Sequence, residues 1–327
     1  MTAPVLEVRD LVVEVGTAHG PMVVVDGVHL EIAAGETLGL VGESGSGKTL
    51  AALAVVRLLG SSARIGSGAV LLEGRDLTAL DGAGMREVRG GRIGMVFQEP
   101  MTALDPAYTV GEQVAETVRR HQRLPRRQAW ERAVALLDRV GIPSPQRRAR
   151  DYPHHFSGGM RQRVVIAMAL SGDPVLLIAD EPTTALDVTV QEQILTLLGE
   201  LRDESGLAML FISHDLGVVA DISDRVAVMY AGQVVETAGV YELFAAPRHP
   251  YTDALLRCVP GPTGTRLATI PGTVPAFDAL PTGCRFAPRC THATAACAAG
   301  PVALDPVEPG HLARCVRADE LARVVHR

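Results

Sequence analysis

A glycine-rich segment at residues 42–49, with the sequence GESGSGKT, limits the possible folds of this chain more than any other feature. It satisfies the pattern G-x-x-x-x-G-K-[ST], and apolar stretches at 35–41 and 50–59 predict a strand before it and a helix after it. Glycines allow backbone N–H groups to turn inward around phosphates, and the start of a helix adds positive potential. The segment therefore predicts a phosphate-binding loop within a strand–loop–helix unit.

Two side chains at the end of this loop have separate expected roles. Lys48 is expected to reach the β- and γ-phosphates of a nucleotide, and Thr49 to bind Mg²⁺. Lys48 is the only lysine in the chain, although lysine and arginine together number 31. Because the planar fork of arginine cannot replace a compact ammonium here, a lysine kept at this position favours phosphate binding over an incidental glycine turn.

A second candidate site lies at residues 176–181, LLIADE, where an apolar strand ends in two carboxylates. The carboxyl ends of parallel strands meet at one edge of a sheet, which is also where the glycine loop is expected to open. Asp180 suits the surroundings of a Mg²⁺ ion, and Glu181 suits the orientation or deprotonation of an attacking water. Short apolar strings ending in Asp-Glu are common, so this prediction depends on the glycine loop.

Residues 156–162, FSGGMRQ, come directly before an apolar helical stretch at 164–170. Ser157 therefore predicts a helix N-cap. By itself, Ser-Gly-Gly predicts only the start of a helix. Its place between the glycine loop and the acidic strand suggests a further role.

The order of the expected elements predicts an α/β fold. Helical patterns dominate residues 110–170, which indicates an inserted helical subdomain. Strands before the glycine loop predict a β-rich lip, and the later alternation predicts a mainly parallel sheet with helices on both faces. The expected strands are 5–15, 23–32, 93–98, 175–179, 208–212 and 226–230, and the expected helices outside the subdomain are 50–59, 189–202 and 216–222.

Charge and hydropathy exclude some classes of function. The net charge of −6 argues against general nucleic-acid binding, because a basic surface supplies most of the affinity in such proteins. No apolar run approaches the roughly 18 residues that a membrane-spanning helix requires. The first residues lack the basic start and apolar stretch of a signal peptide, so we expect a cytoplasmic location.

Six motifs occur in the order typical of ATP-binding-cassette (ABC) ATPases, which the chain resembles over about residues 5–245. They are the glycine loop, Gln98 after a strand, and residues 157–160, 180–181, 184–187 and 213–215. The resemblance implies a P-loop NTPase (RecA-like) core with an antiparallel β lip. It also implies an ATPase domain at residues 1–245 with a helical subdomain at about 99–172.

The resemblance also implies how ATP is bound and hydrolysed. Each nucleotide would lie between the glycine loop of one subunit and the Ser-Gly-Gly helix start of its partner. Gln98 would link Mg²⁺ and the attacking water to the helical subdomain, His214 would contact the γ-phosphate, and Asp187 would signal across the dimer. The expected nucleotide-binding residues are Gly42, Ser44, Gly45, Ser46, Gly47, Lys48, Thr49, Gln98, Ser157, Gly158, Gly159, Asp180 and Asp187, those expected at Mg²⁺ are Thr49, Gln98 and Asp180, and the expected catalytic residues are Glu181, His214 and Gln98.

Residues 98–106, 156–163 and 248–252 resemble more narrowly the dipeptide, oligopeptide and nickel importers. This resemblance implies an ATPase at the cytoplasmic face of the membrane that powers peptide uptake, with nickel as an alternative cargo. The implied partners are a second, homologous ATPase, two membrane permeases and an extracytoplasmic substrate-binding protein, with no nucleic acid. The chain departs from the family at Val15, where an aromatic side chain usually stacks on adenine.

Residues 246–327 are expected to form an irregular C-terminal extension of the type found in oligopeptide transporters. Four cysteines, Cys284, Cys290, Cys297 and Cys315, fall within it, and Cys258 is separate. Disulfides are not expected in a reducing cytoplasm, and the wide spacings differ from those of C-x-x-C zinc ribbons. The family resemblance implies a [4Fe–4S] cluster, while zinc and unligated packing cysteines remain alternatives.

Two other functions compete with transport. A non-transport ABC ATPase acting in translation or DNA repair would share the motifs, but such proteins generally carry a second cassette or coiled-coil and zinc insertions that this sequence lacks. A P-loop kinase or GTPase would not explain residues 157–159 or His214. Association with permeases, as opposed to ribosomes or DNA, would distinguish these functions.

Overall fold

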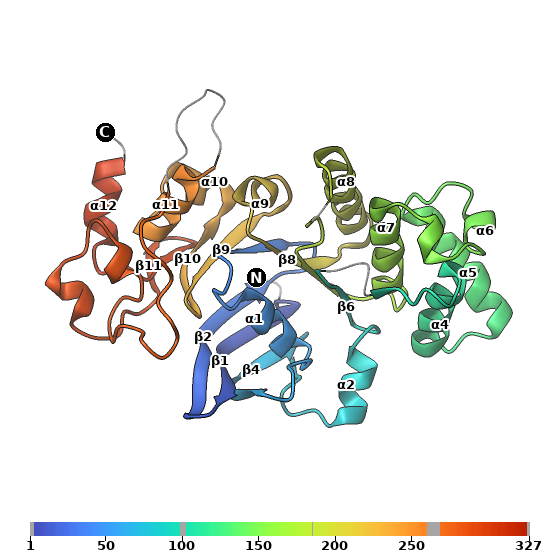
Figure 1. Ribbon diagram of the computed structural model, residues 1–327, viewed down its shortest axis with the longest axis horizontal. Helices are drawn as coiled ribbons and strands as arrows, with labels where there is room; N and C mark the ends of the chain where they lie inside the picture. The colour runs from blue at the N-terminus through green and yellow to red at the C-terminus, as the bar shows by residue number, and fades with distance from the viewer. Residues whose placement is uncertain (1–2, 99–102, 185, 260–268, 326–327) are drawn as a thin grey trace. The chain divides into compact units, whose positions relative to one another are not determined.

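The computed structural model describes residues 3–98, 103–184, 186–259 and 269–325 (Figure 1). The chain divides into two compact units that alternate along the sequence. The first comprises Met1–Leu6, Ile32–Glu36 and Leu71–Ile212, and the second comprises Glu7–Glu31, Thr37–Val70 and Ser213–Arg327. The domain boundary at 245/246 and the subdomain limits of about 99–172 remain predictions.

Three parallel strands form the sheet of the first unit: β6 (Ile93–Val96), β7 (Leu176–Asp180) and β8 (Ala208–Ser213). In their register, Met95 pairs with Ile178, which in turn pairs with Leu210. Every residue of β7 and β8 is buried. Continuous apolar sequence is expected for parallel strands that are covered on both faces. Asp180 is the last residue of the fully buried strand β7.

Helix α7 (Gly158–Ala169) of the first unit packs against α4 (Val110–Gln122) and α5 (Arg126–Arg139) (Figure 1). A capping box begins α4, where Thr109 and Glu112 each bond the backbone of the other. Helical sequence between residues 110 and 170 therefore forms helices, as predicted. The other helices of this unit are α2 (Gly82–Val88), α6 (Pro145–Arg148) and α8 (Val188–Ser205).

In the second unit, β3 (Thr37–Val41) pairs in parallel with β9 (Arg225–Tyr230), and β10 (Gln233–Gly239) pairs antiparallel with β9. Two short strands follow on the other side of β10, β12 (His311–Ala313) and β11 (Asp305–Glu308). The C-terminal extension, expected to be irregular, thus adds strands to this sheet. Their shortness hides them from a search for alternating sequence.

A separate sheet contains β2 (Gly20–Ile32), β1 (Leu6–Thr17), β4 (Ala63–Leu72) and β5 (Arg75–Asp76), as neighbours in that order. The helices of the second unit are α1 (Lys48–Val55), α9 (Leu216–Ile222), α10 (Val240–Ala245), α11 (Pro250–Arg257) and α12 (Ala318–Val325). The predicted limits of α9 are confirmed. Helix α1 is shorter than the predicted 50–59, because Arg57 adopts a left-handed φ of 52° just beyond it. Across the described segments, no helix combines the length and hydropathy needed to cross a membrane.

Candidate nucleotide site

The glycine loop at residues 42–49 joins β3 to α1 in the second unit, as predicted. Gly42 has φ 153°, and a Cβ at this position would lie 2.1 Å from the carbonyl oxygen of Met229. Gly47, the N-cap of α1, has φ 101°. Only glycine fits this backbone without strain, which explains why the loop is glycine-rich.

The ammonium of Lys48 is held by the loop itself. Its Nζ donates to the carbonyl oxygens of Gly42, at 2.7 Å, and Glu43, at 3.0 Å, and lies 3.5 Å from Oγ of Ser46. Lys48 is 5% exposed and Ser46 is 1% exposed, whereas Ser44 and Gly45 are exposed. Thr49 follows Lys48 in the first turn of α1. The loop thus orders its one cation beside the start of a helix.

Glu181 follows the last residue of β7 and makes the contacts expected of a positioned carboxylate. Its Oε2 accepts hydrogen bonds from Nε2 of Gln98 and Oγ1 of Thr184, each at 2.9 Å. Its backbone N–H donates to the carbonyl of Ile212 at 2.9 Å. Glu181 also has a φ of 49°, a conformation that costs a non-glycine residue about 1–3 kcal/mol and is concentrated at functional sites. Asp180, directly before it, is buried.

Ser157 is the N-cap of α7, as predicted, and its hydroxyl accepts the N–H of Met160 at 3.3 Å. Ser157 and Gly158 are exposed, so the start of this helix lies at the surface of the first unit. A Cβ on Gly159 would lie 2.4 Å from Cγ1 of Val190, which belongs to α8. This close approach explains a glycine within a helix.

Asp187 is the N-cap of α8, and its Oδ1 accepts the N–H of Val190 at 2.9 Å. Because Val190 is also the residue against which Gly159 packs, the starts of α7 and α8 lie side by side. The motif at 184–187 is only partly visible, since Ala185 lies outside the described residues, as do residues 99–102 of the motif that follows Gln98.

The predicted site residues fall into two groups, one in each unit. The first unit brings Gln98 to Glu181, and it brings the start of α7, with Ser157, Gly158 and Gly159, to the start of α8. The second unit holds the glycine loop, exposed His214 after β8 and half-buried Val15 on β1. Asp215, the N-cap of α9, accepts the N–H of Gly217 at 2.8 Å and so orders the segment after His214.

Two contacts to the glycine loop were missed by sequence reasoning. The hydroxyl of Tyr251 accepts the N–H of Glu43, and the guanidinium of Arg289 pairs with the Glu43 carboxylate. Residues 248–252 were noted only for their family resemblance, and no local pattern marks Arg289. Both contacts come from the C-terminal extension.

The four clustered cysteines line one small cavity of about 10 Å³ in the second unit. The N–H of Cys284 donates to the carbonyl of Cys297 at 2.8 Å. Burial raises the pKa of the Cys315 thiol to about 11 and also raises the pKa values of Cys284 and Cys290. Among the residues that the structure describes, no three His, Cys, Asp or Glu side chains are grouped so that they could hold a metal ion.

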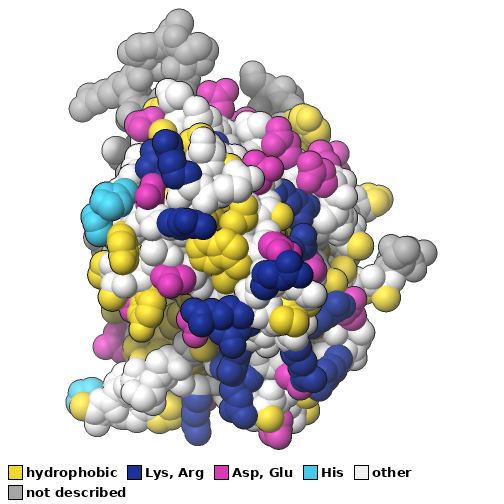
Figure 2. All heavy atoms as spheres, turned by 90° about the vertical axis from the view of Figure 1, so that its right-hand side faces the viewer, with side chains coloured by type: hydrophobic (Ala, Val, Ile, Leu, Met, Phe, Trp, Pro, Cys, Tyr) yellow, Lys and Arg dark blue, Asp and Glu magenta, His cyan; other side chains and the backbone are white. Residues whose placement is uncertain are grey.

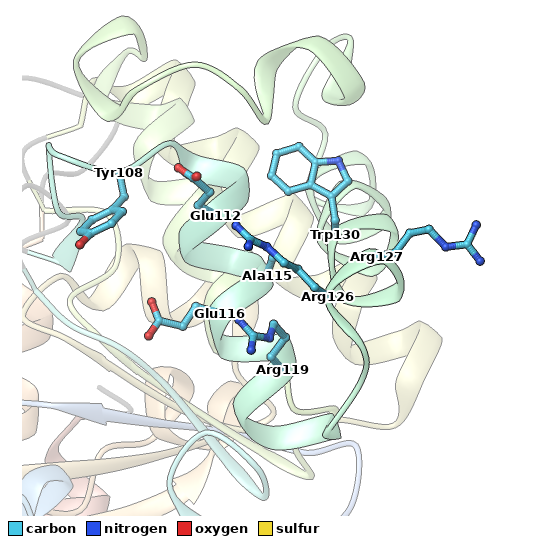
Figure 3. A pocket seen from close by; sticks show the side chains of 8 residues that line it. All are labelled: Tyr108, Glu112, Ala115, Glu116, Arg119, Arg126, Arg127 and Trp130. Carbon is cyan, nitrogen blue, oxygen red and sulfur yellow. The ribbon is translucent and has the colours of Figure 1, made fainter.

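A larger pocket of about 710 Å³ lies in the first unit between α4 and α5 (Figure 3). Carboxylates and the small side chain of Ala115 come from α4, and Trp130 comes from α5. The lining residues are Tyr108, Glu112, Ala115, Glu116, Arg119, Arg126, Arg127 and Trp130. No nucleotide-binding residue predicted from the sequence is among them.

Comparisons with family models agree with this arrangement of motifs. Residues 25–184 match the ABC transporter family, and residues 235–297 match the C-terminal region of oligopeptide/dipeptide transporters. The first match includes the glycine loop, Gln98, Ser157 and Glu181. The second includes Tyr251 and Arg289.

Close relatives match nearly the whole chain. A protein of Brucella melitensis named for peptide import ATP binding, BMEII0863, is 51% identical over 98% of both chains. The protein y4tR of Sinorhizobium fredii, named for a peptide ABC transporter, is 49% identical over 98% of this chain and 96% of its own.

Solved structures show the same fold over about three quarters of the chain. The ATP-binding cassette MJ0796, described as dimeric in a post-hydrolysis state with ADP and Pi, aligns with a TM-score of 0.64 at 27% identity, covering 72% of this chain and 98% of that one. CbiO1 of Clostridium perfringens, part of the ABC transporter complex cbiONQ, aligns with a TM-score of 0.65 at 28% identity, covering 75% of this chain and 92% of that one. The chain therefore belongs to the ABC transporter ATPases that carry the oligopeptide/dipeptide transporter C-terminal region, and it binds and hydrolyses ATP.

Proposed function

We propose that this ATPase powers the import of dipeptides or oligopeptides across the cell membrane, from the cytoplasmic face. The observation that carries the proposal is the full-length similarity to proteins named for peptide import, at about half of all positions and including the C-terminal extension. Nickel import is the alternative cargo, since the motif at 248–252 resembles both kinds of importer. Permeases and a substrate-binding protein would select the cargo.

Each predicted residue would have its own role in ATP binding or hydrolysis. Lys48 and the N–H groups of the glycine loop would bind the phosphates, and His214 would contact the γ-phosphate. Thr49, Gln98 and Asp180 are the residues proposed to hold Mg²⁺, which would supply positive charge at the phosphate oxygens. The hydrogen bonds to Glu181 support its role at the attacking water, because they hold its carboxylate in one orientation.

The exposed helix start at Ser157 supports binding of ATP between two subunits. Free N–H groups at a helix N-terminus are a natural phosphate site, and this helix start lies at the surface of the first unit. Changing a dimer from 1:99 to 99:1 closed requires about 5.5 kcal/mol of differential binding. Two to four charge-assisted hydrogen bonds of about 1.5–3 kcal/mol each would supply it. ATP would thus close the dimer and hydrolysis would reopen it, with Asp187 at the interface and a homologous ATPase as partner.

The pocket between α4 and α5 is the surface proposed to receive a permease segment. Figure 2 shows hydrophobic side chains ringed by arginines and carboxylates on the face of the first unit that carries the helices. Tyr108 is 57% exposed, and such an aromatic beside a charged rim is typical of protein interfaces. Ala115→Arg should fill the pocket and reduce co-purification with permeases, while ATP hydrolysis by the isolated chain stays unchanged.

The extension is proposed to hold a [4Fe–4S] cluster at its four cysteines. Four cysteines that line one cavity supply the number of thiolates that such a cluster needs. Zinc and unligated packing cysteines remain the alternatives. The cluster would stabilise the extension.

Reconstitution tests the transport proposal directly. The chain would be co-expressed with its neighbouring permeases and partner ATPase, placed in liposomes, and assayed for ATP hydrolysis with the substrate-binding protein and either peptides or Ni²⁺. Peptide-stimulated hydrolysis is expected. Stimulation by Ni²⁺ alone would support the alternative cargo, and association with ribosomes or DNA in place of permeases would refute transport.

A further inference from the structure

All three polar groups of Glu43, the second residue of the glycine loop, are engaged. Its carboxylate accepts two hydrogen bonds from Arg289, Nη1 to Oε2 at 2.6 Å and Nη2 to Oε1 at 3.1 Å. Its N–H donates to the hydroxyl of Tyr251 at 2.9 Å, and its carbonyl accepts the ammonium of Lys48 at 3.0 Å. Two of these three contacts come from residues more than 200 positions away in the chain.

Tyr251 is fixed by a network of buried groups. It is fully buried in α11, and its N–H donates to Nδ1 of His249 at 3.1 Å. The carboxylate of Glu236, also fully buried, accepts the N–H groups of Arg248 at 2.6 Å and of His249 at 2.9 Å. The turn before α11 therefore has one conformation, which directs the Tyr251 hydroxyl at the loop. Burial raises the pKa of Tyr251, so the hydroxyl keeps its proton.

The side chain of Arg289 is also held by several contacts. Its side chain is 4% exposed, its Nε donates to the carbonyl of Pro271 at 2.8 Å, and its guanidinium lies 5.8 Å from the ring centre of Tyr230. It belongs to a 3₁₀ turn, Ala287–Arg289, between Cys284 and Cys290. A planar guanidinium in a bidentate pair fixes orientation as well as distance, which the point charge of lysine cannot do.

We propose that the C-terminal extension braces the glycine loop, with Tyr251 and Arg289 as positioning residues that act on ATP through Glu43. The two contacts to Glu43 fix the orientation of the backbone at Gly42 and Glu43. The carbonyl oxygens of these two residues both accept hydrogen bonds from the ammonium of Lys48. A loop already ordered in this conformation binds phosphate more tightly, because less freedom is lost on binding. The C-terminal extension, which lies outside the ABC transporter family match, would therefore contribute directly to nucleotide affinity. The inference rests on the proposed role of the loop in ATP binding.

The test measures binding of the fluorescent analogue mant-ATP with Mg²⁺ to the full-length chain. Tyr251→Phe removes only the hydroxyl, Arg289→Met removes the guanidinium, and Glu43→Gln removes the negative charge with which Arg289 pairs. Each should weaken binding about tenfold, equivalent to about 1.4 kcal/mol. Because Arg289 acts through the carboxylate of Glu43, Arg289→Met should add little in the Glu43→Gln background. Tyr241→Phe, at a tyrosine that is 84% exposed, and Arg317→Met, beside the cysteines but bonded to Glu320, are matched controls.

Further readouts separate positioning from a general loss of structure. KM for ATP should rise with kcat within twofold of wild type, and hydrogen exchange of residues 42–49 should accelerate in Tyr251→Phe without a change in melting temperature. If Arg289→Met does not fold, Tyr251→Phe decides alone. Unchanged mant-ATP affinity in a folded Tyr251→Phe variant, or additive effects of the Glu43 and Arg289 substitutions, would overturn the proposal. Lys48→Ala should abolish binding. If the Lys48→Ala variant still bound mant-ATP, the glycine loop would not be the ATP site.

Discussion

Gln98 donates a hydrogen bond from Nε2 to Oε2 of Glu181 at 2.9 Å, joining the residue that follows β6 to the residue that follows β7. The same oxygen accepts Oγ1 of Thr184, so two donors orient one carboxylate. Glu181 has a left-handed backbone, which is unfavourable for a non-glycine residue and persists only where neighbouring contacts stabilise it. Both donors, Gln98 and Thr184, belong to the first unit.

Gln98→Ala should lower kcat for ATP hydrolysis by about 10- to 100-fold, because the carboxylate loses the donor that Gln98 supplies. ATP affinity should change less, since the glycine loop remains intact. Gln122→Ala is the matched control, as Gln122 bonds Ser171 and Asp173 in the same unit. Equal kcat for Gln98→Ala and wild type would show that the contact does not serve the reaction.

Gly159→Ala should destabilise the chain by about 1–3 kcal/mol, because the added Cβ would lie 2.4 Å from Cγ1 of Val190. Gly158→Ala is the control, since its Cβ would meet only Leu186 Cδ2 at 3.6 Å, an ordinary contact. Thermal melting of both variants measures the difference. Val190→Ala in the Gly159→Ala background should restore stability, and failure of this rescue would contradict the steric explanation.

His249 should make stability depend on pH. Burial lowers the pKa of His249 from 6.5 to about 4, so between these values the unfolded chain binds a proton that the folded chain does not. The contribution of neutral His249 to the free energy of unfolding is fully present above pH 6.5 and is lost as the pH falls toward 4. At about 1.4 kcal/mol per pKa unit, lowering the pH from 7 to 5 should cost about 2 kcal/mol.

Urea unfolding at pH 7 and pH 5 measures this loss, with His249→Asn for comparison. Asparagine can still accept the N–H of Tyr251 but does not titrate, so that variant should lose about 2 kcal/mol less on acidification. His19→Asn, on an exposed turn, should behave as wild type. Identical pH dependence of wild type and His249→Asn would show that His249 titrates normally in the folded chain.

Anaerobically purified protein should be coloured and contain about four irons per chain, if the extension holds the proposed cluster. Cys297→Ser should remove the visible absorption, because the buried Cys297 would be a ligand. Cys258→Ser should retain it, since Cys258 does not line the cavity. A colourless, iron-free chain that is folded would refute the cluster. If such a chain contained one zinc ion per molecule, the site would be assigned to zinc.

Local chemistry made much of this site predictable from sequence. A serine before two glycines and an apolar helix predicts the N-cap at Ser157, and the limits of α9 follow from apolar periodicity. The end of α1 was missed, because the left-handed backbone of Arg57 has no signature in a non-glycine residue. The pairing of Glu43 with Arg289 could not be predicted, since the two residues are 246 positions apart and meet only after the fold has formed.

The proposed role of Glu181 is tested most directly by ATP hydrolysis and mant-ATP binding measured on the same preparation of the Glu181→Gln variant. Glutamine keeps the shape of the side chain but cannot accept a proton from water, so hydrolysis should fall at least 100-fold while binding stays at the wild-type level. Hydrolysis at the wild-type rate by this variant would contradict the proposed site.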